Sequence, residues 1–331
     1  MMFVSLLIMV VFSVILSVSS ASLIWFWVSL EMASIFLIPL FNSPSLQSKE
    51  VMWEYFLTQA LGSSGFLVSS FMKGSEMVFL KVCENHIFSW GSISLGFLFL
   101  KMGMPPFHSW SLRVVEVMSF SQLIYLLTLS KVVPLVGTWT IQPFVESEVW
   151  LFIALSLAFS LKGVIEGSIR RALVYSAILN ILWVILGMKV SSTLAVWLFI
   201  SYSMSILSIL VTFQSSIFRL EDTLMCLSAP LGVKLSLAVN VLSLIGVPPT
   251  LGFFTKLSVL KNVCLGSSGS LVFIVFTVSM VFMIIYFWLI SMIVLSKKTT
   301  FRLNLSMNNL TVCLLIFSAI LSIALVIFQL I

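Results

Sequence analysis

The sequence reads KMGMPPFHSW from Lys101 to Trp110 and LIGVPPTLGFFTK from Leu244 to Lys256, so Gly-x-Pro-Pro occurs twice within apolar stretches. Proline lacks a backbone N–H and clashes with the preceding turn, so a Pro-Pro pair breaks a helix. In a membrane the freed carbonyls are tolerated only beside protein or a water-filled cavity. A bend that serves only packing is the alternative for either motif alone. Two corresponding breaks are typical of a transporter's ion path built from inverted repeats.

The composition indicates an integral membrane protein. Of the 331 residues, 60% are apolar and 8% are charged, and the mean hydropathy is +1.21. Apolar runs of about 20 residues follow one another along the chain, whereas a signal peptide would be one such run before a polar chain. We therefore expect no removable targeting segment. The runs are continuous rather than alternating, so they predict helices and not the strands of a barrel.

About eleven membrane crossings are expected. They fall near residues 2–20, 22–41, 51–72, 87–104, 120–140, 148–166, 169–189, 192–214, 229–264 with a break, 270–295 and 310–330. A short continuation over 107–118 follows the first Pro-Pro. The prediction is an all-α polytopic protein with a first half-repeat over 1–140, broken at Pro105 and Pro106. A second half-repeat covers 141–295, broken at Pro248 and Pro249, and a C-terminal helix covers 296–331.

Basic residues predict the orientation. If the first crossing starts on side A, that side carries Lys49, Lys162, Arg170, Arg171, Arg219, Lys297, Lys298 and Arg302, and the other side carries Lys73, Lys81 and Lys189. The excess places side A in the cytosol or matrix. The amino terminus would face that compartment and the carboxyl terminus the opposite one.

Redox centres, metal sites and nucleic-acid binding have no support. The cysteines Cys83, Cys226, Cys264 and Cys313 are far apart and form no CxxC pair, and the histidines are His86 and His108 alone. These residues do not match an iron–sulfur, zinc or haem site. The net charge of +6 comes from scattered lysines and arginines rather than a basic patch, which argues against nucleic acid as a partner.

Several charges fall inside predicted membrane segments: Glu31, Lys101, Arg113, Glu116, Lys131, Lys234, Lys256 and Lys261. Each buried charge costs roughly 2.5–3.5 kcal/mol, so such residues must be paired, hydrated or functional. Glu31 lies in the middle of SLIWFWVSLEMASIFLIPLF, too deep to reach water. Lys131 is similarly deep, and Pro134 frees a carbonyl in the preceding turn that a lysine or a water could satisfy. A purely structural ion pair is the alternative to a functional role.

Lysines and a carboxylate in series can pass protons. Removal from water disfavours the charged form of an ammonium, and a nearby carboxylate favours it. A change in the distance between Glu31 and Lys101 would therefore decide whether Lys101 holds its proton. A protonated Lys131 approaching Lys101 would act in the opposite direction. Secondary candidates, which could hold water between the lysines, are His108, Tyr175, Ser176, Asn180, Asn240 and Ser243, although a serine more often bonds its own helix backbone.

The segments WFWVSLEMASIFLIPL, YFLTQA, KMGMPPFHSW, LSKVVPL, RRALVYSAI and GVPPTLGFFTK occur in order over about residues 22–260. Together they resemble the family of subunit 2 of mitochondrial NADH dehydrogenase, an antiporter-like membrane-arm subunit of respiratory complex I. The resemblance implies two inverted five-helix repeats, without three amino-terminal helices that bacterial relatives have. It also implies that Glu31 and Lys101 form the family's ion pair. Lys131 would be the central lysine and Lys256 the lysine of the second broken helix.

The implied function is proton conduction across the inner mitochondrial membrane by a Glu/Lys relay, coupled to quinone reduction elsewhere in NADH:ubiquinone oxidoreductase. The chain would be part of a translocating enzyme and bind no cofactor itself. NADH, FMN, iron–sulfur clusters and ubiquinone would belong to other subunits. The implied partners are other membrane-arm and accessory subunits, phospholipids, protons and water. The implied topology is multi-pass, with the amino terminus in the matrix and the carboxyl terminus in the intermembrane space.

This sequence departs from the family at three places. The family often has Pro-Glu where this chain has Leu112-Arg113, and often a histidine where it has Asn180, which cannot titrate. Glu54 stands where some relatives carry lysine, which suggests a surface or subunit contact. Two other functions stay open: an Mrp-type cation/proton antiporter subunit, and a passive scaffold in the membrane arm. The order of the motifs and the missing amino-terminal helices favour the complex I subunit.

Overall fold

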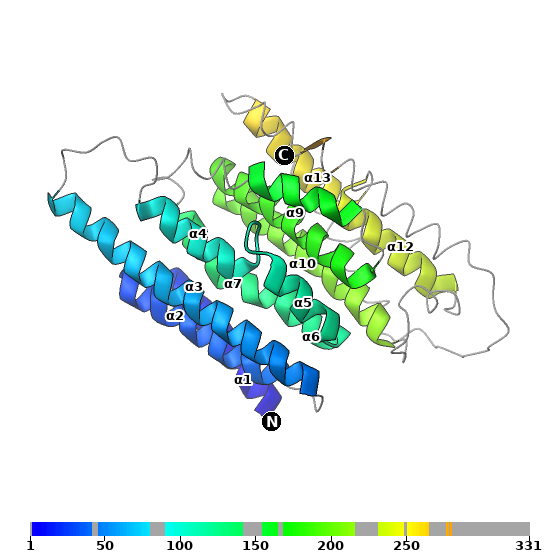
Figure 1. The fold of residues 1–331 in the computed structure, drawn as a ribbon. Coiled ribbons are helices and arrows are strands. Elements are labelled where there is room, and N and C mark those ends of the chain that lie inside the picture. The colour runs from blue at the N-terminus through cyan, green and yellow to red at the C-terminus, as the bar shows by residue number, and fades with distance from the viewer. Residues whose placement is uncertain are drawn as a thin grey trace. The chain divides into compact units, whose positions relative to one another are not determined.

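The computed structural model describes residues 2–41, 46–79, 90–141, 154–164, 168–215, 231–247, 250–264, 276–277 and 279. These ranges contain helices and turns and no strand (Figure 1). The prediction of an all-α protein is confirmed for this part of the chain. By internal packing the chain divides into two compact units, Met1–Phe159 and Ser160–Ile331.

The first unit is a bundle of long apolar helices. Its elements are α1 (Met2–Ser19), α2 (Leu23–Leu37), the 3₁₀ helix η1 (Ile38–Phe41), α3 (Leu46–Phe79), α4 (Trp90–Met102), α5 (Ser109–Val117), α6 (Phe120–Ile124), the π-helix η2 (Tyr125–Leu129) and α7 (Ser130–Ile141). α1 packs against α2, α2 against α3, and α3 along α4 (Figure 1). The predicted break of the fourth crossing is confirmed, because α4 and α5 lie on either side of Pro105 and Pro106.

The second unit contains the 3₁₀ helix η4 (Leu161–Val164), α9 (Ile169–Val190), α10 (Ser192–Ser215), α12 (Leu231–Ile245) and α13 (Leu251–Cys264). α10 packs against α9, α12 and α13. A tight turn at Ser191 joins α9 to α10, and the Ser191 N–H donates to the Gly187 carbonyl (2.9 Å). A Cβ atom at Gly187 would lie 2.7 Å from the Leu198 side chain, so the absence of one lets the two helices approach closely.

Four helices in the described residues are long and apolar enough to cross a membrane: Leu23–Phe41, Phe120–Ile141, Arg170–Val190 and Ser192–Val211. Two shorter apolar helices cover Val4–Ser19 and Trp90–Met102. The last two predicted crossings, near 270–295 and 310–330, lie outside the described residues except for 276, 277 and 279.

Helix α3 is longer than the crossing predicted within it. Helix α3 begins at Leu46 and ends at Phe79, whereas the sequence predicted 51–72. Lys49, Glu50 and Glu54 lie in the early turns of this helix. The physical reason is that hydropathy marks only the part of a helix that suits hydrocarbon, and lysine and glutamate are good helix formers outside it.

Serine hydroxyls bond to their own helices throughout the bundle. Ser29 donates to the Phe26 carbonyl (2.6 Å), and Ser94 donates to the Gly91 carbonyl (2.7 Å). Such bonds satisfy the hydroxyl without a partner from another helix. Buried serines are therefore satisfied within their own helices, and their number does not by itself mark a polar path.

Helices α12 and α13 meet at a glycine. A Cβ atom at Gly252 would lie 2.0 Å from the carbonyl oxygen of Ser243. This neighbour is backbone, so it cannot rotate away as a side chain could. Helix α13 can therefore start beside the end of α12 only because residue 252 has no side chain.

We predict that Gly252→Ala lowers the free energy of unfolding by about 1–3 kcal/mol, the usual cost of overpacking. The measurement is unfolding of the purified full chain in mixed micelles of increasing SDS content. The matched control is Ser258→Ala, which removes a hydroxyl that donates to the Thr255 carbonyl of its own helix. Equal stability of the two variants would contradict the close contact.

Candidate functional site

The first break is a glycine helix stop followed by proline. Gly103 has a φ of 68°, a left-handed conformation that glycine adopts without steric cost. The Met104 N–H donates to the Phe99 carbonyl (2.9 Å), and the Gly103 N–H donates to the Leu100 carbonyl (3.1 Å). This pair of bonds is a Schellman motif. The Pro-Pro that follows cannot continue the helix.

Side chains from neighbouring helices also bond carbonyls at this break. Trp110 of α5 donates its indole N–H to the Leu100 carbonyl (3.1 Å). Gln59 of α3 donates its amide to the Lys101 carbonyl (3.1 Å). The Tyr55 ring packs beside the Trp110 ring, with 5.9 Å between centroids. Protein donors thus bond the Phe99, Leu100 and Lys101 carbonyls at the broken end of α4.

The second break also turns at a glycine with a positive φ, with a different pair of bonds. Gly246 has a φ of 85°, and the N–H groups of Gly246 and Val247 donate to the Leu242 carbonyl (3.0 and 3.2 Å). Lys256 of α13 then donates from Nζ to the carbonyls of Leu244 (3.0 Å) and Ile245 (2.9 Å). A cation at a helix carboxyl terminus also complements the helix dipole. Pro248 and Pro249 lie outside the described residues.

The two breaks share one construction. In each, a side chain of the helix after the break bonds carbonyls at the end of the helix before it. The donor is a neutral indole in the first unit and an ammonium group in the second. The sequence predicted both breaks but not this closure. The available signal was a glycine two residues before the first proline, the usual position of a helix stop.

Trp183 of α9 lies beside Lys256. The ammonium nitrogen is 5.9 Å from the centroid of the Trp183 ring, which is within the range of a cation–π contact. The indole is fully buried. Sequence reasoning missed Trp183, because tryptophan is common in this chain and nothing local distinguishes it.

Lys101 and Glu31 lie near each other without a direct bond. Lys101, in the last turn of α4, is 1% exposed, and its Nζ donates to the Leu30 carbonyl of α2 (3.4 Å). The Glu31 carboxylate is half-buried and accepts a bond from the Ser63 hydroxyl of α3. The charges of Glu31 and Lys101 are close enough to interact electrostatically. Within the described residues, no ion pair of 4.0 Å or less joins them.

Gly62 makes room for the Lys101 side chain. A Cβ atom at Gly62 would lie 2.5 Å from Cγ of Lys101. The lysine stem therefore passes directly over the α3 backbone. Gly62 and Ser63 were missed by the sequence reasoning, since small residues in a membrane helix are frequent and carry no specific signal.

A small cavity adjoins Lys101. About 10 Å³ of it is open to the centre of a water molecule, and its polar lining comes from Ser34, Tyr55, Gln59, Lys101 and Ser130. A space of roughly this size holds a single water when polar partners surround it. Pro134 also lines the cavity.

Lys131 directly follows Ser130, which lines this cavity, but Lys131 itself does not line it. It is buried in α7, with 5% of its surface exposed. Among the residues that the structure describes, none accepts a hydrogen bond from its ammonium group. Pro134 removes the N–H that would otherwise bond the Ser130 carbonyl, and both residues line the cavity. The sequence predicted that Pro134 frees a carbonyl in the preceding turn. That carbonyl belongs to Ser130, which borders a space large enough for one water.

The secondary candidates are buried but engaged. The His108 ring packs 5.2 Å from the Phe159 ring, centroid to centroid. In α9, Ser176 donates to the Leu173 carbonyl (2.8 Å) and Asn180 donates to the Ser176 carbonyl (2.9 Å). Tyr175 of the same helix is buried, and its Cβ would lie 2.6 Å from a Cβ atom on Gly163. The polar groups of Ser176 and Asn180 thus bond backbone of their own helix.

The charges predicted within membrane segments differ in how far the protein covers them. Arg113 and Glu116 of α5 are exposed, and so is Lys261 of α13. Arg113 donates from Nε to the Glu54 carboxylate of α3 (2.7 Å) and forms an ion pair with it. Their place within a predicted membrane segment stays a prediction, and the structure adds only that other helices do not cover them. The Lys234 side chain lies outside the described residues. Glu54, through its bond to Arg113, connects α3 to α5.

No group of three or more histidine, cysteine, aspartate or glutamate side chains that could hold a metal ion occurs within the described residues.

The chain matches known membrane proteins over most of its length. Residues 20–283 match the family described as NADH:quinone oxidoreductase/Mrp antiporter, transmembrane. The chain is 31% identical to NADH-ubiquinone oxidoreductase chain 2 of Anopheles gambiae, over 92% of this chain and 89% of that protein. It is also 31% identical to the protein of the same name from Artemia franciscana, over 74% of this chain and 75% of that protein.

Solved structures share the fold at low identity. A chain of respiratory complex I from Thermus thermophilus superimposes with a TM-score of 0.78 at 19% identity, covering 98% of this chain and 77% of that one. A chain of the Mrp complex from Dietzia gives a TM-score of 0.73 at 17% identity, covering 89% of this chain and 61% of that one. The polytopic helical fold is thus antiporter-like. On the sequence match over residues 20–283, the chain belongs to the NADH:quinone oxidoreductase/Mrp antiporter family.

Proposed function

We propose that this chain is a proton-translocating membrane-arm subunit of an NADH:ubiquinone oxidoreductase, complex I, in the inner mitochondrial membrane. The observation that carries the proposal is Lys101, an ammonium group 1% exposed within the bundle, near Glu31 and beside a water-sized cavity. Burial of a charge there is costly unless it is used. The relatives named NADH-ubiquinone oxidoreductase chain 2 support the assignment to complex I.

The proton switch consists of Glu31, Ser63 and Lys101. In the described state the carboxylate bonds the Ser63 hydroxyl and the ammonium bonds the Leu30 carbonyl. Movement of Lys101 from that carbonyl to the carboxylate would form a direct ion pair and favour the protonated amine. Return to the described state would weaken the pairing and favour release of the proton.

Lys131 receives the proton from Lys101. A water in the cavity would contact the Lys101 side and the Ser130 side, and Ser130 immediately precedes Lys131 in α7. Two buried ammonium groups repel each other, so protonation of one favours release from the other. Lys256 acts further along the path in the second unit. His108, Tyr175, Ser176 and Asn180 are secondary positions on the path.

The remaining assignments follow from the same proposal. The half-repeats cover residues 1–140 and 141–295, and a C-terminal helix covers 296–331. The amino terminus faces the matrix and the carboxyl terminus the intermembrane space. This chain carries no redox centre, and NADH, FMN, iron–sulfur clusters and ubiquinone are bound by other subunits. An Mrp-type cation/proton antiporter is the second candidate, because the Mrp chain shares the fold.

Replacement of Lys131 tests the relay. Proton transfer by a positioned side chain usually contributes about 10²- to 10⁴-fold, so Lys131→Met should lower proton-coupled NADH:ubiquinone turnover by at least about tenfold. The measurements are NADH oxidation and dye-reported proton uptake in inverted membrane vesicles with the assembled complex.

The control for Lys131→Met is Lys261→Met, which removes an exposed lysine and should leave both rates unchanged. Full coupled turnover of Lys131→Met in an assembled complex would instead indicate a passive scaffold. Cation-dependent proton exchange by the chain without NADH would indicate the antiporter.

The switch predicts unequal effects of its two oxygen-bearing side chains. Glu31→Gln removes the charge that favours protonated Lys101 and should lower coupled turnover about tenfold or more. Ser63→Ala removes only the hydroxyl and should lower it by a smaller factor. In the double variant Ser63→Ala should add little, since the hydroxyl acts through the carboxylate. Additive losses in this cycle would contradict the arrangement.

Substitution of Lys256 separates helix capping from proton transfer. Lys256→Met leaves two carbonyls without their donor and should lower the free energy of unfolding by about 1–3 kcal/mol. Lys256→Gln keeps a neutral donor, so it should retain more stability but still lose coupled turnover. Restored turnover in Lys256→Gln would show that the lysine only caps α12. Stability is followed by SDS unfolding and turnover in membrane vesicles.

A further inference from the structure

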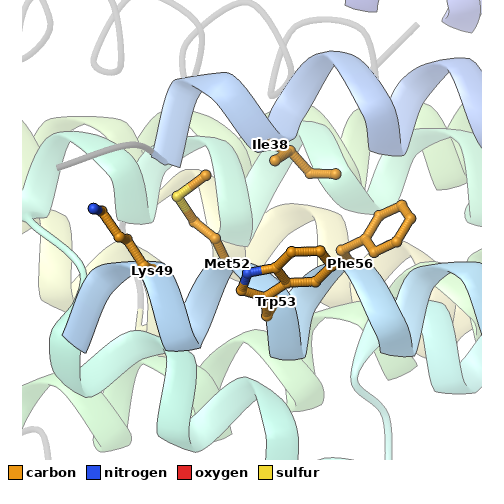
Figure 2. Close-up of a pocket in the computed structure, with 5 residues that line it drawn as sticks. All are labelled: Ile38, Lys49, Met52, Trp53 and Phe56. Atoms are coloured by element: carbon orange, nitrogen blue, oxygen red, sulfur yellow. The ribbon is translucent and has the colours of Figure 1, made fainter. Parts of the chain in front are cut away.

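A groove lies between η1 and the early turns of α3, apart from the Glu31–Lys101 region. Ile38, Lys49, Met52, Trp53 and Phe56 line it, and its volume is about 450 Å³ (Figure 2). Figure 2 shows Ile38 opposite Trp53 and Phe56. Lys49 lies at one end, and Met52 lies between Lys49 and Trp53. The lining is therefore apolar along its length and cationic at one end.

The groove continues into an apolar face of α3. Trp53 is 65% exposed, and Leu57, Leu61 and Val68 are also exposed. These residues recur at helical spacing, so they form one stripe. The stripe covers about 20 Å at about 1.5 Å per residue. A surface of this kind suits contact with hydrocarbon chains.

Lys49 is the single charged residue among the five that line the groove. Glu50 follows it directly in the helix and so points to a different face. Glu54, about one turn further on, is held by Arg113 through a 2.7 Å bond. The Lys49 ammonium is thus not neutralised by Glu54. Lysine and tryptophan together are typical of the membrane–water interface, where the lysine head reaches the polar layer.

We propose that this groove binds one anionic phospholipid. An acyl chain lies over Ile38, Met52, Trp53 and Phe56, and the phosphate group meets the Lys49 ammonium. Charge complementarity selects this occupant over a protein helix, because the groove offers one cation at the interface and an apolar surface elsewhere. The proposal requires only that the chain spans a membrane and does not depend on proton translocation.

Quenching of Trp53 fluorescence tests the site. The full chain is reconstituted in phosphatidylcholine vesicles with a minor fraction of either phosphatidylglycerol or phosphatidylcholine brominated on the acyl chains. The difference between the wild-type and Trp53→Phe signals isolates Trp53. One lysine near the surface is worth about 1 kcal/mol toward anionic lipid, which is about fivefold in affinity. Brominated phosphatidylglycerol should therefore quench Trp53 at about fivefold lower content than brominated phosphatidylcholine.

Variants of Lys49 identify the head-group contact. Lys49→Gln should remove the preference, and Lys49→Arg should retain it. The matched control is Lys261→Gln, an exposed lysine of α13, which should also retain it. Helical circular dichroism and the elution volume verify the fold of each variant.

Two results would overturn the proposal. Equal quenching by the two lipids in the wild-type chain would mean that hydrocarbon meets Trp53 without a head-group site. Absence of quenching by either lipid would mean that acyl chains do not enter the groove at Trp53. Neither result concerns coupled turnover, so failure here is distinct from failure of the proton relay.

Discussion

Backbone carbonyls at the end of a broken membrane helix need donors, and this need organises both breaks. In hydrocarbon an unsatisfied carbonyl costs several kcal/mol, so the chain must supply a donor where Pro-Pro removes one. Each break turns through a glycine, and the next helix returns a side chain to the carbonyls left behind. At the second break, the close approach of α13 to α12 at Gly252 brings Lys256 near the carbonyls that it bonds.

The choice of donor separates the two units. Trp110 and Gln59 bond carbonyls at the end of α4, which leaves the Lys101 ammonium directed to α2 instead of its own helix end. Lys256 has no such freedom in the described state, because its ammonium bonds the Leu244 and Ile245 carbonyls. Lys101 in the first unit thus does not cap its own helix, whereas Lys256 in the second unit caps α12. Loss of the Lys256 side chain would therefore leave two carbonyls at the end of α12 without this donor.

Buried and exposed charges have different uses in this protein. Lys101 and Lys131 are enclosed, where the free-energy cost of a charge makes its protonation sensitive to small displacements of a neighbour. Arg113 and Glu54 are a surface pair that links α5 to α3. Pairs of this kind contribute little to stability on their own. Here the pair connects the short helix after the first break to α3.

The sequence by itself determined the helical class and the positions of the breaks, and it singled out Lys101 and Lys131, whose side chains are buried. These properties are local: continuous apolar runs require helices in hydrocarbon, and proline and glycine act on the backbone at their own positions. The order of the short motifs also predicted the family. Hydropathy underestimated α3 at both ends, since it does not detect a helix that continues into the polar layer.

Only the tertiary structure decided which charges are covered and what they contact. Arg113 and Lys101 both occur in apolar surroundings along the chain, yet one is exposed and the other is enclosed. The Ser63 bond to Glu31, the space at Gly62 and the Trp183 ring beside Lys256 all join residues distant in sequence. Such contacts depend on which helix faces meet, and the periodicity of a helix that is apolar on every side does not specify this.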